Sequence, residues 1–197
     1  MPRAILFTLG SLAGLIVLAV GFSVFFGPRL SIDKAERLNK RMVFLRDRAM
    51  GSPPDTNALN ELVNSLQSRN FFERIAAIGF LGQLGSNAAP ATDALVQSLA
   101  NGDPYAGREA AHSLGEIGPG AKRAVPALLN VLQQHATGDI AWFAAESLGS
   151  IADPADPTVI AALKQAAASS DALMRDSAQK GLDRLARRRT DAGTIQH

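Results

Sequence analysis

The residues that could do chemistry gather in the stretch REAAHSLGEIGPGA, which runs from Arg108 to Ala121. His112 and Glu116 are four residues apart, a spacing that would put a metal-binding or acid–base pair on one face of a helix. The chain has two further histidines, His135 and His197, and neither has a spacing that supplies a third ligand. We therefore interpret His112 as a surface residue and expect no metal site and no cofactor.

The segment GEIGPG, residues 115–120, has the glycine content of a phosphate-binding loop. Such a loop requires a preceding strand and free N–H groups at the start of the next helix, whereas a helical pattern precedes Gly115. Gly82 and Gly85 show the same spacing in an earlier segment of similar sequence, which favours repeat punctuation over a phosphate site. Cysteine is absent and no serine has a candidate base beside it, so we expect no enzyme.

Internal repeats account for these features. The apolar segments ELVNSL (61–66), ALVQSL (94–99) and ALLNVL (127–132) follow one another at a constant step. A second set of segments begins at Ile75, Arg108, Trp142 and Arg175 and keeps the same step to within one residue. This period of about 33 residues is that of a stacked repeat protein. Each unit therefore predicts two helices, the second with an apolar stripe at Ala110, Ala111, Leu114 and Ile117.

The ends of the second helices carry their own signals. Asp103, Asp139 and Asp171 precede the predicted second helices and are suitable N-caps. Gly118, followed by Pro119, reads as a C-terminal stop. Basic residues in RLARRR (184–189) are expected at the end of the last helix, where they would complement its dipole.

This pattern resembles the HEAT repeat, in particular the HEAT-like class found in phycobilisome lyase subunits. The resemblance covers about residues 57–187 and implies an all-α fold, an α-solenoid of about four HEAT-like helix pairs. It departs from the family where Ile75 and Trp142 replace the consensus arginine. The fourth copy also lacks the Leu-Gly pair, as expected of a terminal cap. The residues that carry the resemblance are Arg108, Ala110, Ala111, Leu114, Gly115, Ile117 and Gly118, with AVPALL at 124–129.

Residues 4–26 carry no charge over their whole length. At about 1.5 Å per residue a helix of this length crosses a hydrocarbon core of about 30 Å, so we expect a single transmembrane helix before the array. A cleaved signal peptide is the alternative, although its apolar region normally spans only ~7–15 residues. The residues expected in the lipid bilayer include Ile5, Leu12, Leu15, Ile16, Leu18, Phe22 and Phe25.

The orientation of this single-pass protein, in a bacterial-type inner membrane, follows weakly from charge. Arg3 is the only basic side chain before the span, whereas residues 27–50 carry seven basic and three acidic side chains. The positive-inside bias slightly favours a cytoplasmic array, while short-tailed anchors that deliver a domain outside keep the other side open.

Between the span and the array, Ala35, Leu38, Met42, Leu45 and Ala49 mark one helix face after a capping Ser31. This helix would form a coiled coil, lie on the membrane surface or cap the array, and its length of about two heptads favours the last two. We divide the chain into an anchor (1–28), a juxtamembrane helix with a Pro-rich linker (29–54), the array (55–189) and a flexible tail (190–197).

The predicted binding surface is a row rather than a motif. Stacking the second helices aligns positions 75, 108, 142 and 175, and one turn later positions 79, 112, 146 and 179, on the expected concave face. Tryptophan and arginine are enriched in interface hot spots, although Trp142 would equally cover a neighbouring helix. The residues predicted to bind a partner are Arg108, His112, Trp142, Glu146, Arg175 and Gln179.

These features indicate a membrane-tethered scaffold that binds another protein, as an accessory subunit or an assembly or stability factor of a membrane-associated complex. A bilin-lyase-like chromophore-handling protein is the alternative that the resemblance implies. Nucleic-acid binding is less favoured, because residues 51–183 carry eight basic and fourteen acidic residues.

Overall fold

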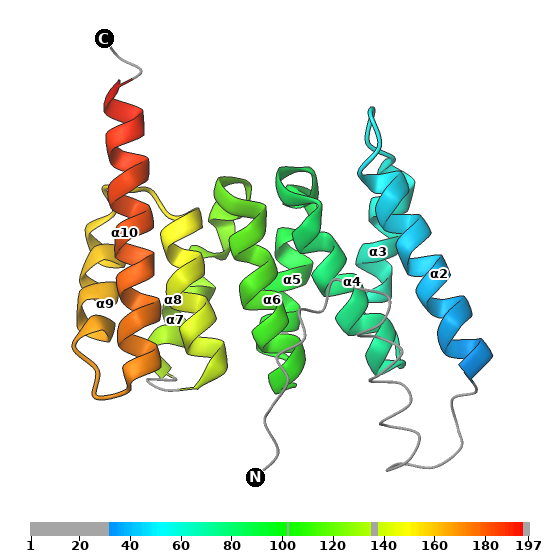
Figure 1. Cartoon of the computed structure of the whole chain (residues 1–197), viewed down its shortest axis with the longest axis horizontal. Coiled ribbons are helices and arrows are strands. Elements are labelled where there is room, and N and C mark those ends of the chain that lie inside the picture. The colour runs from blue at the N-terminus through cyan, green and yellow to red at the C-terminus, as the bar shows by residue number, and fades with distance from the viewer. Residues whose placement is uncertain (1–31, 102, 135–137, 195–197) are drawn as a thin grey trace.

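The computed structural model describes residues 32–101, 103–134 and 138–194, and every regular element in these ranges is a helix (Figure 1). The predicted membrane span and Ser31 lie outside the described residues. None of the helices in these ranges is long and apolar enough to cross a bilayer.

Eight helices of the described ranges form four antiparallel pairs that stack in chain order, as the repeats predict (Figure 1). Two 3₁₀ segments, η1 (Gly85–Ala91) and η2 (Gly118–Ala124), connect the first three pairs. The pairs are α3 (Thr56–Ser65) with α4 (Phe71–Gln83), α5 (Thr92–Ala100) with α6 (Pro104–Ile117), α7 (Val125–Gln134) with α8 (Asp139–Ile151), and α9 (Pro157–Ala167) with α10 (Ala172–Thr194).

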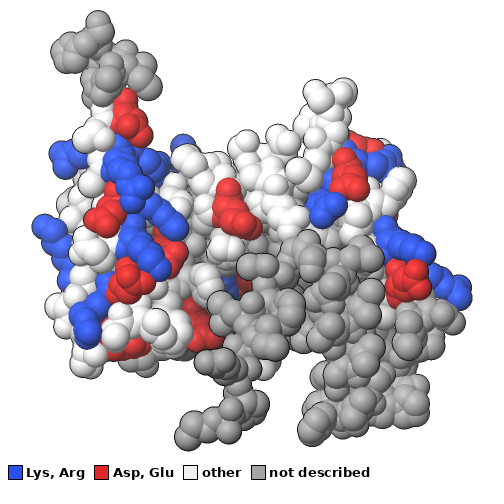
Figure 2. Space-filling model, in the orientation of Figure 1, with Lys and Arg blue, Asp and Glu red and all other residues white. Residues whose placement is uncertain are grey.

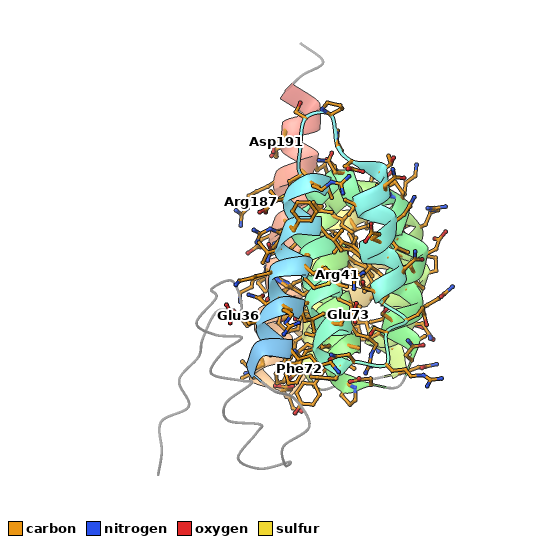
Figure 3. All side chains as sticks on the ribbon, turned by 90° about the vertical axis from the view of Figure 1, so that its right-hand side faces the viewer. Glu36, Arg41, Phe72, Glu73, Arg187 and Asp191 are labelled. Atoms are coloured by element: carbon orange, nitrogen blue, oxygen red, sulfur yellow. The ribbon has the colours of Figure 1, made fainter. Side chains whose placement is uncertain are left out.

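The segment before the array forms helix α2 (Ile32–Ala49), which caps the array. It packs on both α3 and α4, with Met42, Leu45 and Ala49 buried in that contact. Arg41 points toward Glu73 of α4 and its guanidinium lies 3.1 Å from that carboxylate (Figure 3). The helix thus covers the first pair and packs mainly on α3.

The second helices α4, α6, α8 and α10 pack side by side with their backbones close together. Ser113 is buried and its hydroxyl donates to the carbonyl oxygen of Ile78 in the preceding second helix, at 2.9 Å. A Cβ atom on Gly82 would lie only 2.9 Å from the Cβ of Ser113. The contact between these helices therefore requires a glycine on one side and a small residue on the other.

The same contact recurs between the next two second helices. Ser147 donates its hydroxyl to the carbonyl oxygen of Ala111 at 2.7 Å, and a Cβ atom on Gly115 would lie 3.0 Å from that of Ser147. Gly82 and Gly115 thus lie inside helices, where they allow close packing. The expectation that they mark the boundaries between repeat elements is wrong. The helix stop lies at Gly118, whose φ of 71° favours glycine.

Helix α10 packs against α8 at a point where both helices have glycine. A Cβ atom on Gly149 would lie 2.6 Å from the Cα of Gly181, and one on Gly181 would lie 2.5 Å from the carbonyl oxygen of Ala145. Gly181 therefore stands where α6 and α8 have Ser113 and Ser147, whereas the alignment of the repeats places Lys180 there. The packing register of α10 is thus shifted by one residue from the sequence alignment. We call this series of contacts the glycine seam.

The caps follow the predictions in two of three cases. The carboxylate of Asp103 accepts from the backbone N–H of Tyr105 at 3.0 Å, and that of Asp171 accepts from the N–H of Leu173 at 2.9 Å. The prediction for Asp139 is wrong, because this residue is the first of α8 and Gly138 occupies the cap position without a side-chain bond.

The two layers of the stack differ in spacing. Adjacent second helices contact each other extensively. In the layer of the first helices, η1 and η2 lie between successive pairs and contact α5 and α7.

We predict that Gly149→Ala lowers the midpoint of thermal unfolding, because the new methyl group meets the backbone of Gly181. Overpacking of this kind costs about 2 kcal/mol, which corresponds to roughly 5 °C for a chain of this size. Circular dichroism on the full chain measures the effect.

Gly79→Ala is the matched control. The atom nearest to its new methyl group is the flexible Glu109 carboxylate, at 3.0 Å, and alanine has the higher helix propensity. Equal midpoints for the two variants would contradict the close contact between α8 and α10.

Candidate binding surface

We define the second-helix face as the outward side chains of α4, α6, α8 and α10. All six residues predicted to bind a partner belong to these helices. His112, Arg175 and Gln179 are exposed, whereas Arg108, Trp142 and Glu146 are half-buried. In the packing register of the glycine seam, Asp176 and Lys180 stand opposite Trp142 and Glu146, so Arg175 and Gln179 do not continue the predicted rows.

The half-buried members of the first row connect one repeat to the next. The Arg108 guanidinium lies 3.7 Å from the carboxylate of Asp139, at the start of the next second helix. Arg74 makes the equivalent contact with Asp103 at 3.3 Å. The first repeat therefore has an arginine equivalent to Arg108. It is Arg74, one residue before Ile75, which the alignment of the repeat sequences places at this position.

Trp142 takes the place of the arginine in the third repeat. Its indole N–H donates to the carboxylate of Asp171 at 2.9 Å, and the same carboxylate caps α10. Arg175 turns away from the row and donates to the carbonyl oxygens of Ser169 and Ser170, at 2.9 and 2.8 Å. Both side chains thus stabilise the loop between α9 and α10.

Glu146 is the centre of an ionic cluster between α8 and α10. Its carboxylate lies 3.4 Å from the ammonium of Lys180 and 3.2 Å from the guanidinium of Arg184. Arg184 also donates to the backbone carbonyl of Glu146 at 3.0 Å, which anchors the two helices at both backbone and side chain.

An arginine near the end of α10 forms hydrogen bonds to the neighbouring helix α8. Arg188 donates to the carbonyl oxygens of Gly149 and Ala152, at 3.2 and 2.8 Å, and so satisfies the C-terminal carbonyl groups of α8. The prediction that these basic residues end α10 and complement its own dipole is wrong, because α10 continues to Thr194 and its last turn holds no basic residue. Arg188 instead complements the C-terminal end of α8.

His112 is exposed near the middle of the face. Its Nε2 lies 3.7 Å from the carboxylate of Glu116, and its ring lies 5.2 Å from that of Phe143 on α8. The ranges that the structure describes contain no group of three histidine, cysteine, aspartate or glutamate residues that could hold a metal ion.

The sequence interpretation missed Glu109, the acidic residue in the contact between α4 and α6. Its carboxylate lies over Gly79, and burial raises its pKa, an effect that His112 and Arg108 partly offset. The signal was present in the alignment, where Glu109 stands at the position of Ala76 in the first copy and Phe143 in the third.

Charge is distributed unevenly over the face. Lysine and arginine side chains gather along α10 and on α2, at the two ends of the array (Figure 2). On α6, between these ends, neither Glu109 nor Glu116 forms an ion pair with a lysine or arginine of the described chain. The centre of the face is therefore acidic, with His112 beside it.

Comparison with known proteins agrees with this architecture. Residues 92–183 match the family described as HEAT repeats, a range that runs from α5 into α10. This match supports a HEAT-like repeat in the second, third and fourth pairs. The match is to HEAT repeats as a class and does not extend to phycobilisome lyases. No curated protein matches the chain.

We predict that Glu109→Gln makes the chain more stable than wild type at pH 7. The carboxylate ionises near 4.5 in the unfolded chain and at a higher pH in the folded chain. Above pH 4.5 the unfolded state releases a proton that the folded state keeps, so wild-type stability falls as pH rises and levels off above the folded pKa.

The glutamine variant has no such loss. Urea unfolding at pH 4 and pH 7 measures the difference in unfolding free energy between the two chains, and the pH 4 pair is the internal control. A difference that is the same at both pH values would contradict a buried, ionisable Glu109.

Proposed function

We propose that the chain is a protein-binding scaffold, tethered to a membrane by its N-terminal segment, that serves as an accessory subunit or an assembly or stability factor of a membrane-associated complex. HEAT repeats commonly act in protein–protein interaction, and this chain matches them over residues 92–183. A repeat array specifies a shape, so the partner must be inferred from the side chains on that shape.

The observation that carries the proposal is the set of contacts that hold the second-helix face together. Its backbone is held by the glycine seam, and its helix ends are joined by the contacts of Arg74, Arg108 and Trp142. A surface that is already ordered loses little conformational entropy when a partner binds. The face is thus suited to recognition without rearrangement.

These contacts divide the predicted residues into two groups. Arg108, Trp142, Glu146 and Arg175 bond within the array and maintain the shape of the face. His112 and Gln179 are exposed and can contact a partner directly, and the Gln179 amide also donates to the Asp183 carboxylate at 2.8 Å. We add Glu116, which is exposed one turn after His112.

The chemistry of the centre indicates the kind of partner. Within the described residues, no lysine or arginine forms an ion pair with the exposed Glu116 or with the half-buried Glu109, and His112 stands with Phe143 as an aromatic pair. Charge complementarity then favours a protein segment with lysine or arginine side chains over an acidic one. Nucleic acid, whose phosphates carry negative charge, is disfavoured by the same argument.

The uncharged stretch at residues 4–26 supports the membrane tether. A tether raises the effective concentration of the array near a partner in the same membrane and so strengthens a contact that is weak in solution. We keep the cytoplasmic side as the favoured location of the array. No catalytic step is part of this proposal.

We predict that Glu116→Arg reduces the recovery of the partner in crosslinking and pull-down from membranes. Reversing a charge at the centre of the face should cost at least about 1.4 kcal/mol, a tenfold loss of affinity. Quantitative mass spectrometry of the recovered proteins measures the loss.

Lys122→Glu is the matched control, since Lys122 is exposed in η2 and forms no ion pair within the described chain. Circular dichroism should show the same helix content in all three chains. Equal recovery of the same partners by wild type and by both variants would refute the central role of the second-helix face.

A further inference from the structure

Large apolar side chains are exposed along one edge of the array. Phe71 is the first residue of α4, and Tyr105 and Leu173 are the second residues of α6 and α10. Their exposed fractions are 37%, 61% and 55%. Because the second helices run side by side in the same direction, their first turns lie at the same end of the stack (Figure 1). We call this end the N-terminal edge.

The aromatic residues on this edge contact each other rather than scatter. The rings of Phe71 and Tyr105 lie 6.0 Å apart and meet edge to face, and Phe72 lies 5.6 Å from Phe71. The guanidinium groups of Arg74 and Arg108 stack over Phe71 and Tyr105, each at 5.8 Å. Single exposed apolar residues are ordinary, whereas an aligned group at one edge indicates a contact with another apolar surface.

The chain outside the structure joins the array at this same edge. Helix α2 begins at Ile32 beside the first turn of α4, where Figure 3 shows Phe72. Only five residues, 27–31, separate Ile32 from the uncharged stretch that ends at Phe26. Fully extended, the six Cα–Cα steps from Phe26 to Ile32 reach at most about 22 Å. The first residue of α2, Ile32, therefore lies no farther than this from Phe26, the last residue of the uncharged stretch.

The opposite end of the stack carries charged side chains of α10. Figure 3 shows Arg187 and Asp191 of α10 at that end, away from Phe72. The N-terminal edge carries the exposed cations Lys34 and Arg69, and its aromatic rings lie against the guanidinium groups of Arg74 and Arg108. Aromatic rings flanked by lysine and arginine are the combination that proteins place in the interfacial region of a bilayer.

We propose that the N-terminal edge rests on the bilayer, with Phe71, Tyr105 and Leu173 inserted among the lipid headgroups. This inference rests on the membrane tether of the proposed function. The second helices then stand upright on the membrane, and the second-helix face looks sideways, parallel to the plane of the bilayer. In this orientation His112 and Glu116 face a neighbour embedded in the same membrane.

The test uses the full chain in vesicles of phosphatidylethanolamine and phosphatidylglycerol. Because the chain lacks cysteine, the variants Tyr105→Cys and Leu173→Cys each carry one nitroxide spin label at a defined place. Met50→Cys is the matched control, since Met50 is 53% exposed just after the other end of α2. Electron paramagnetic resonance then compares collisions of each label with oxygen, which enters lipid, and with a nickel complex, which stays in water.

We expect the oxygen-to-nickel collision ratio to rise severalfold at positions 105 and 173 when the chain is in vesicles, and to keep its water-like value at position 50. Flotation of the same vesicles reports on the tether separately. A chain that floats with water-like ratios at all three labels overturns the edge contact and leaves the tether intact, and a chain that does not float overturns both. Labels that are immobilised without gaining oxygen contact also overturn the proposal, because a protein segment then covers the edge.

Discussion

The close approach of the second helices is the constraint on which the rest of the structure depends. Gly82, Gly115 and Gly149 each face a residue of the next second helix that is small or also glycine. At these distances a side chain on the glycine would overlap its neighbour, so the spacing of the helices is fixed by composition. The hydroxyl groups of Ser113 and Ser147 then fix the sliding register, since each reaches one particular backbone carbonyl.

Once the backbones are this close, the polar groups at the helix ends follow. The first turns of neighbouring second helices lie within reach, which allows Arg74 and Arg108 to pair with Asp103 and Asp139. At the last contact the exposed C-terminal carbonyl groups of α8 lie beside α10, where Arg188 satisfies them. These bonds hold the shape of the face, and the side chains that they leave unused define what it can recognise.

The candidate site could be predicted only in part from the sequence. The repeat period predicts the helix pairs and their stacking, and the polar character of position 112 predicts that His112 faces outward. Both are local properties of the sequence. The bonding of Trp142 to Asp171 does not, because it joins residues of two different repeats across a loop. Glu109 was overlooked for the same reason: its carboxylate is buried by Gly79 of the preceding repeat, and an alignment of single repeats does not show that neighbour.

The sequence by itself determined the number of helix pairs, their period and their HEAT-like pattern, because helical periodicity and the glycine stop at Gly118 are encoded over short spans. The end of α10 was not among these, since the tail predicted from residue 190 is helical as far as Thr194. Tertiary structure decided the register of α10, which is shifted by one residue from the repeat alignment and sets Lys180 in place of Gln179 beside Glu146. It also decided which exposed side chains share an edge. The physical reason is that both depend on how far one helix slides along the next, a quantity set by the close contact of Gly149 with Gly181 and invisible within either helix alone.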